Sequence, residues 1–240
     1  MDNINIFLDM QREAIIKDFS DIGSCFVSLS EKKLWELKQN RGWSVEPISG
    51  CRKENALIIR KSSNHEPECW VLWNYTGYRR AYTKFLEHYY PEFRNALNSS
   101  IHVDHLEPKY RFSTKSNHFV RLHLVPKEIN TAYGSGFERN FFESERRKKL
   151  PNATYMSWLT FSKAYGERPP KKSSGTHVWD SWAFQLANKY HLRTGDSEFL
   201  AYFGLLNVLR LGYTGFYSGS YEPVDMQKMQ FKFNQMKINN

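Results

Sequence analysis

The residues with the clearest potential for chemistry lie between positions 101 and 130. The stretch "VDHLEPKYRF" (103–112) places Asp104 directly before His105, and Asn130 follows further along the chain. An aspartate oxygen and an asparagine carbonyl are hard ligands that suit Mg²⁺ or Mn²⁺. A neutral imidazole can take a proton from water. These three groups could therefore provide the cation and the general base that phosphodiester hydrolysis requires.

Each of these residues also has an ordinary structural explanation. A lone Asp-His pair is usually an ion pair or part of a turn, and an Asn in a first helical turn is usually a cap. Their joint order favours a site, because a strand pattern and then a helix pattern lie between His105 and Asn130.

The sequence of the same segment also predicts the strands and the helix that position these residues. "SIHVDHLEP" predicts a short strand, "KYRFSTKSN" a polar loop, and "HFVRLHLV" a second strand with β-branched residues. Pro126 stands where helices favour proline, in the first turn, and Glu128 is placed near the positive helix end. The predicted order is therefore strand, loop, strand and helix, with Asp104 and His105 closing the first strand.

The stretch "VDHLEPKYRF…NHFVRLHLVPKEINTAYGSGFE" resembles the HNH motif of endonucleases, also called the ββα-metal or His-Me finger motif. In that family a strand ends in Asp-His, an Asn introduces the second strand, and the helix carries a final His or Asn. The resemblance implies that His105 is the general base, that Asp104 and Asn130 bind a metal, and that Asn117 orients the base. If the loop is read one residue shorter, His118 takes the place of Asn117.

The resemblance also implies a cofactor and two biological roles. The final Asn of the motif is similar to that of HNH nucleases that use Asp and Asn on Mg²⁺, with Mn²⁺ as the alternative cation. The tail "FVRLHLVPKEINTAYGSGFER" resembles a branch found among bacterial nucleases and toxin-type domains. We therefore expect a bacterial or phage restriction-like or defence nuclease, or a toxin whose partner is an immunity or regulatory protein.

The charge of the chain favours a polyanionic partner. Lys and Arg number 34 against 25 Asp and Glu, which gives a formal net charge of +9 and attracts nucleic acid or an anionic membrane surface. No long amphipathic helix confines its basic residues to one face, so a membrane surface fits less well. The expected phosphate contacts within or just past the motif are Lys109, Arg111, Arg121 and Arg139; the alternative for each is a solvated side chain. Glu138 and His123 are expected to be structural.

The cysteines and the apolar runs exclude several classes of protein. The three cysteines show no C-x-x-C spacing, so neither a disulfide framework nor a structural zinc site is expected. No stretch approaches the roughly 20 apolar residues that span a bilayer, and the first residues lack the pattern of a signal peptide. We expect a cytoplasmic protein, or one delivered into a target cell's cytoplasm if it is a toxin.

The segments on either side of the motif carry clear local signals. "SLSEKKLWELKQNRG" predicts a helix with Ser30 as N-cap and Gly42 as its end. "NALIIRK" and "CWVLWNY" predict a small hairpin. Residues 77–90 predict a helix that Pro91 ends, and the chain beyond residue 175 predicts two apolar helices.

These patterns predict an α+β fold in which a ββα-metal motif is embedded among helices, with a separate small β-hairpin. Three regions are expected: 1–100, mixed helix and hairpin; 101–150, the nuclease core; and 151–240, helical. The expected function is metal-dependent DNA endonuclease. The alternatives are an inactive HNH-fold module that binds nucleic acid and a toxin that cleaves RNA.

Overall fold

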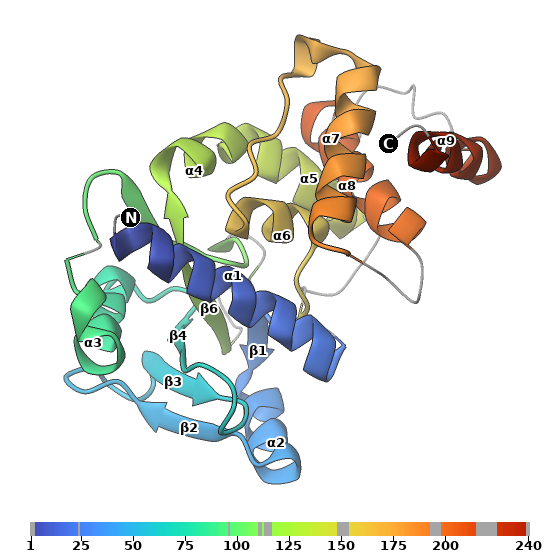
Figure 1. Ribbon diagram of the computed structural model, residues 1–240. Helices are drawn as coiled ribbons and strands as arrows, with labels where there is room; N and C mark the ends of the chain where they lie inside the picture. The colour runs from blue at the N-terminus through green and yellow to red at the C-terminus, as the bar shows by residue number, and fades with distance from the viewer. Residues whose placement is uncertain are drawn as a thin grey trace. The chain divides into compact units, whose positions relative to one another are not determined.

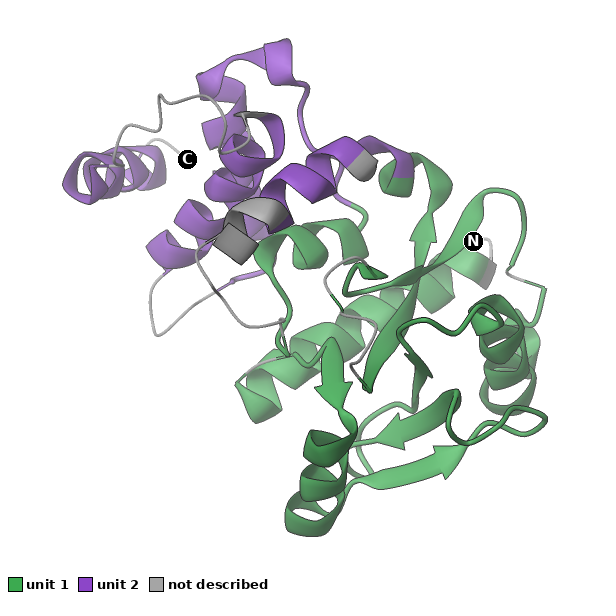
Figure 2. Cartoon of the chain, turned by 180° about the vertical axis from the view of Figure 1, so that it is seen from behind, with its two compact units in different colours: residues 1–130, 152–166 green, residues 131–151, 167–240 purple. Residues whose placement is uncertain are grey.

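The computed structural model has a mixed α+β architecture, as the sequence predicts, and divides into two units (Figures 1 and 2). The first unit comprises Met1–Asn130 with Asn152–Gly166, and the second comprises Thr131–Pro151 with Glu167–Asn240. The described residues are 3–23, 25–95, 97–109, 112, 117–147, 154–192, 198–214 and 225–238.

The first unit is built on an antiparallel sheet. Its strands are β1 (Ser28–Ser30), β2 (Ser44–Pro47), β3 (Ala56–Arg60), β4 (Glu68–Leu72), β5 (Ile101–His105) and β6 (His118–Pro126). The order is β1-β6-β4-β3-β2, and β5 pairs with β6 outside this path. The first residues of β6 pair with β1 and β4, whereas residues 122–126 pair with β5. Strand β6 therefore joins the candidate site to the rest of the sheet.

The predicted hairpin is present, but it is not a separate element. Strands β3 and β4 pair with each other, as expected, and β4 then pairs with β6 through Trp70 and Arg121. Most residues of both strands are buried. Because these strands are apolar on both faces, they are stable only inside a larger sheet with helices on each side.

Helices cover the sheet of the first unit on both faces. They are α1 (Asn3–Ile22), α2 (Glu31–Arg41), α3 (Tyr78–Tyr89) and α6 (Trp158–Ala164), with a short 3₁₀ turn, η1 (Pro91–Phe93). Residues of α1 and α3 pack on Ile58 and Val71 in one core. Residues of α2 pack on Leu57 and Trp70 in the other. Alternate side chains of β3 thus enter different cores, as strand geometry requires.

The local signals around α2 and α3 are confirmed. The Ser30 hydroxyl accepts a hydrogen bond from the Lys33 N–H at 3.2 Å. Gly42 ends α2 with φ of 64°, in the left-handed region that favours glycine. Helix α3 begins after Gly77 and ends before Pro91, and it buries Tyr82 and Phe85. Residues close to each other in the sequence are thus sufficient to set where α2 and α3 begin and end.

The second unit is helical. Its helices are α5 (Ser135–Arg147), α7 (Thr176–Lys189), α8 (Glu198–Thr214) and α9 (Met226–Ile238), with a 3₁₀ turn, η3 (Lys172–Ser174). The two helices predicted near the C-terminus are therefore present as α7 and α8. The Tyr213 ring of α8 contacts Phe137 of α5 and Trp179 of α7, with ring centroids 4.8 and 5.5 Å apart. Among the described residues, no helix has the length and apolarity needed to cross a bilayer.

The two units follow different boundaries from the three regions expected from the sequence. Strands β5 and β6 belong to the first unit together with the N-terminal strands, and α6 returns to it from beyond residue 150. Helix α4 (Lys127–Tyr133) begins in the first unit and ends in the second. Because β6 pairs with β1, β4 and β5, residues 101–130 share one sheet with the N-terminal strands, whereas residues 131–150 belong to the second unit.

Candidate functional site

Strands β5 and β6 and helix α4 follow one another in the predicted order, and Figure 1 shows α4 continuing directly from β6. The strands are antiparallel, with Asp104 opposite His123 and His105 opposite Leu122. Successive side chains of a strand point to opposite faces. The side chains of Asp104 and His105 therefore point to opposite faces of β5. The element order agrees with the prediction, while its assignment to an HNH centre stays a prediction.

His105 is nearly buried, with 9% of its surface exposed. Its ring lies edge-on to the ring of Tyr78, the first residue of α3, with centroids 4.6 Å apart. Its Nε2 atom is buried and has no hydrogen-bond partner within the described part of the chain. Burial and the ammonium groups of Lys109 and Lys163 together lower the pKa of His105 to about 4, against the opposing effect of Asp104. The imidazole is therefore neutral at pH 7.

Asp104 forms an ion pair with a residue that sequence reasoning missed. The Lys163 ammonium lies 2.6 Å from its carboxylate, and the exposed fractions of the two side chains are 8% for the lysine and 26% for the aspartate. Lys163 belongs to α6, which Ser157 caps by accepting a hydrogen bond from the Thr160 N–H at 3.1 Å. A lysine in this segment carries no signal that predicts its partner in β5.

Asn130 lies on the same side of the β5–β6 ribbon as Asp104, and its observed contact is with His102. The Asn130 amide nitrogen is 3.0 Å from Nδ1 of His102. His102 precedes Asp104 by two positions, so both side chains leave the same face of β5. The alternation in "HVDH" is the signal that could have identified His102 from the sequence. The structure thus brings His102, Asp104 and Asn130 to one face.

His123 also lies on this face, directly across from Asp104. It is 1% exposed, and its Nε2 atom lies 3.3 Å from the Ala164 carbonyl oxygen at the end of α6. Burial, with a further contribution from Arg121, lowers the pKa of His123 to about 3. The ring therefore links β6 to α6, which agrees with the structural role expected for it.

Asn117 and His118 do not support His105 as expected. His118 begins β6 and Asn117 directly precedes it, whereas His105 pairs with Leu122, about 13 Å along the strand from His118 at ~3.3 Å per residue. The backbone carbonyl of Asn117 accepts a hydrogen bond from the Glu31 N–H at 3.0 Å, which places Asn117 next to the start of α2. The His118 ring contacts Phe112 at 5.4 Å. The length of β6 separates His105 from the residues predicted to orient it.

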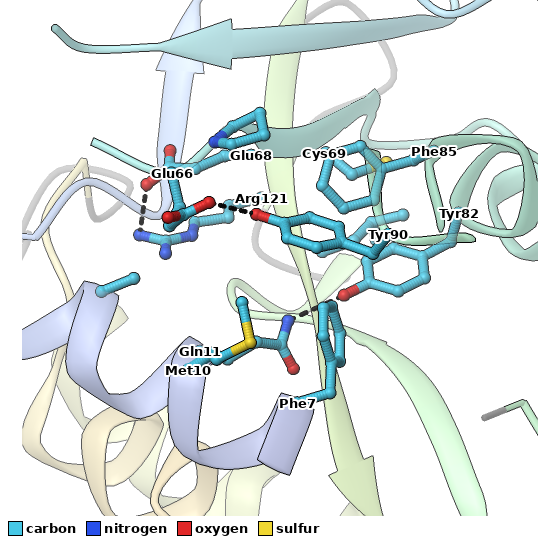
Figure 3. Close-up of a pocket in the computed structure, with 13 residues that line it drawn as sticks. Phe7, Met10, Gln11, Glu66, Glu68, Cys69, Tyr82, Phe85, Tyr90 and Arg121 are labelled. Atoms are coloured by element: carbon cyan, nitrogen blue, oxygen red, sulfur yellow. Dashed lines mark hydrogen bonds and ion pairs between the residues drawn. The ribbon is translucent and has the colours of Figure 1, made fainter. Parts of the chain in front are cut away.

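Arg121 was expected to contact phosphate, and this expectation is wrong. It is 4% exposed, and its guanidinium lies 2.9 Å from both Asp18 and Glu68. Figure 3 shows it beside Glu68 in the lining of a small, partly open pocket. Lys61 completes this cluster by contacting the same two carboxylates. An arginine held between two buried acids is not available to a nucleic-acid backbone.

Two of the other predicted phosphate contacts, Lys109 and Arg139, lie in different units of the fold. The Lys109 ammonium lies 4.8 Å from the centre of the Tyr78 ring, next to His105. Arg139 is exposed on α5 in the second unit. Arg111 lies outside the described residues. Lys109 is therefore the one predicted phosphate contact that the described residues place at the end of β5.

The expected cation has candidate ligands at this site, but no cluster of acidic or sulfur ligands. Among the described residues, no group of three or more His, Cys, Asp or Glu side chains could hold a metal ion. The candidate ligands are the oxygens of Asp104 and Asn130, which suit Mg²⁺ or Mn²⁺, and the His102 imidazole, which suits transition metals such as iron or zinc.

Side chains from β5, α4 and α6 meet at the candidate site. Its central features are the buried imidazole of His105, the Asp104–Lys163 ion pair, and the contact between Asn130 and His102. No family model, no curated protein and no solved structure matches this chain.

Proposed function

We propose that the chain hydrolyses phosphodiester bonds of nucleic acid at the end of β5. The observation that carries this proposal is the His105 ring: it is buried, neutral at pH 7, and has a ring nitrogen without a hydrogen-bond partner among the described residues. A buried polar atom of this kind favours a water molecule or a substrate oxygen as its partner. His105 is therefore the group that would take a proton from the attacking water.

The low pKa of His105 suits a site that receives an anion. Burial and two nearby ammonium groups favour the neutral ring in the free protein. A phosphate bound close to the ring would favour the protonated form and raise this pKa toward neutrality. A base whose pKa lies near the working pH is the more efficient catalyst. Substrate binding would thus prepare the imidazole for proton transfer.

A divalent cation would bind on the face that carries Asp104, His102 and Asn130. The Asp104 carboxylate already has a positive group, the Lys163 ammonium, at 2.6 Å, which supports this position as one that attracts a cation. Carboxylate and amide oxygens suit Mg²⁺ or Mn²⁺. When bound, such a cation stabilises the charge that develops on the phosphate and on the leaving oxygen.

Basic and aromatic residues surround His105 on its own side. The Tyr78 ring lies against His105, and the Lys109 ammonium lies over the same ring. Arg79 and Arg80 follow Tyr78 in the first turn of α3 and are exposed. Such cations bind the phosphates of either DNA or RNA without regard to sequence. This arrangement supports a polyanionic substrate more strongly than a small neutral one.

Cleavage assays test this proposal directly. The purified chain is incubated with plasmid DNA, single-stranded DNA and total RNA, each with Mg²⁺, Mn²⁺ or EDTA. We expect cleavage of at least one substrate that EDTA abolishes. Asp104→Asn and Asn130→Ala should reduce cleavage, and high Mn²⁺ should restore part of it, because both changes act through metal occupancy.

Two outcomes would contradict the proposal. The same cleavage by a His105→Ala protein purified in parallel would show that the activity comes from elsewhere. Binding of nucleic acid without cleavage under any of these conditions would favour the alternative function, a module that binds nucleic acid and lacks catalysis.

A further inference from the structure

Lys163 is held beside Asp104 by contacts to both strands of the site. The Thr160 hydroxyl donates a hydrogen bond to the Leu106 carbonyl oxygen at 3.2 Å, which links α6 to the end of β5. The contact between His123 and the Ala164 carbonyl links α6 to β6. Lys163 lies between these two contacts in the sequence of α6. Its backbone is therefore fixed, while its long side chain retains several rotatable bonds.

The ammonium of Lys163 occupies the position at which a metal would meet the Asp104 carboxylate. The two charged groups are 2.6 Å apart, and the lysine side chain is only 8% exposed. Repulsion between two cations on one carboxylate is strong where water is largely excluded. A divalent ion that approaches the Oδ2 oxygen bound by Lys163 therefore has to displace the ammonium. Since 26% of the Asp104 side chain is exposed, solvent has access to the carboxylate.

We propose that Lys163 is an internal competitor for the metal at Asp104. The ammonium and the divalent cation bind this carboxylate in turn, and a metal ion binds only when it displaces the lysine side chain. This inference rests on the proposed function for the identity of Asp104 as a metal ligand. Lys163 would then lower the affinity of the free protein for the metal ion.

Metal binding in the absence of nucleic acid tests this competition. The Mn²⁺ affinity is measured by electron paramagnetic resonance and by calorimetry for the wild type, Lys163→Met and Lys163→Met/Asp104→Asn. We expect Lys163→Met to bind Mn²⁺ at least ~10-fold more tightly than the wild type, because the competing cation is gone. The second substitution should remove this gain, because it removes the shared carboxylate.

A matched control is available in α1. Lys17 and Asp21 form an ion pair with the same 2.6 Å separation, but their side chains are 41% and 40% exposed. Lys17→Met should therefore leave the Mn²⁺ affinity unchanged. Circular dichroism checks the folding of each variant, and Lys163→Gln replaces Lys163→Met if the latter does not fold.

Equal Mn²⁺ affinity in the wild type and in the folded Lys163 variant would overturn the inference. So would a gain in affinity that persists after Asp104→Asn. The measurement needs no substrate, so its result is separate from that of the cleavage assays. A chain that cleaves nucleic acid and shows no competition would keep the proposed function and lose this inference.

Discussion

Two groups of buried charges in the first unit differ in how completely their members are paired. In the Arg121 cluster, formed by Asp18, Lys61, Glu68 and Arg121, each carboxylate contacts both cations at distances between 2.5 and 2.9 Å. The four residues are between 1% and 7% exposed. At the end of β5, the Lys163 ammonium faces Asp104, which is partly exposed, and His105 has a buried nitrogen without a hydrogen-bond partner among the described residues.

This difference is the one expected between a structural role and the chemical role proposed for the end of β5. Burial by itself raises the pKa of the Asp18 carboxyl, but Arg121 and Lys61 outweigh it, so that the pKa is lowered. In a fully paired cluster every charge has a counter-charge, and the charges stabilise one another. At the end of β5, burial and nearby cations lower the pKa of His105, and the hydrogen-bonding capacity of its ring is not fully used. Perturbed groups with incomplete pairing are typical of functional sites.

The largest expected effect is on catalysis at the end of β5. His105→Ala should reduce the cleavage rate by about 10²–10⁴-fold, the usual contribution of a general base. The free energy of unfolding should fall only by the amount that the ring contact between His105 and Tyr78 contributes. Single-turnover cleavage and urea denaturation measure the two quantities. A large loss of stability with little loss of cleavage would instead assign His105 a structural role, like that of the Arg121 cluster.

The next effect is on stability in the Arg121 cluster. Arg121→Met should lower the free energy of unfolding by about 3–5 kcal/mol, because it leaves Asp18 and Glu68 buried with too few cations. The control is Arg52→Met, which changes an exposed arginine and should alter stability by less than about 0.5 kcal/mol. Urea denaturation of both variants makes the comparison. Similar stabilities would show that the buried cluster is not required for the fold.

A third effect concerns pH. The pKa of His123 is about 3 in the folded chain, against an ordinary value of 6.5. Between these two pH values, His123 is protonated in the unfolded chain and neutral in the folded chain. The free energy of unfolding should therefore fall below pH 6.5, by up to about 1.4 kcal/mol per pH unit for this one group. Urea denaturation between pH 7 and pH 5 measures the slope.

His123→Gln should reduce this slope, whereas His88→Gln, at an exposed position, should leave it unchanged. The same slope in all three proteins would show that His123 is not the group responsible.

The smallest effect concerns nucleic-acid affinity. Lys109→Ala should reduce the slope of log affinity against log salt by about 0.9 on duplex DNA, the value for one lost phosphate contact. The affinities are measured on a His105→Ala background, so that the DNA stays intact. Arg139→Ala tests whether the second unit also contacts phosphate. Unchanged slopes would move the binding surface to another basic region, such as Arg79 and Arg80.

Local signals in the sequence predicted several elements correctly. Ser30 and Gly42 define α2 because a cap and a left-handed glycine act on the nearest turn of the helix. The apolar spacing of α3, α7 and α8 and the order of β5, β6 and α4 were predicted for the same reason. A pattern of neighbouring residues also drew attention to Asp104 and His105, and the structure places them in a partly buried, perturbed environment.

The tertiary structure alone decided which charged groups meet. Arg121 resembles any basic residue of a strand, and its partner Asp18 lies 103 positions away in α1. Lys163 reaches Asp104 only because α6 returns to the first unit, and Asn117 lies far from His105 because β6 runs past the end of β5. The sequence by itself determined the elements, since local propensity depends on adjacent residues. Pairing across the sheet and burial of charge depend on the whole fold, and they separated the structural arginine from the candidate base.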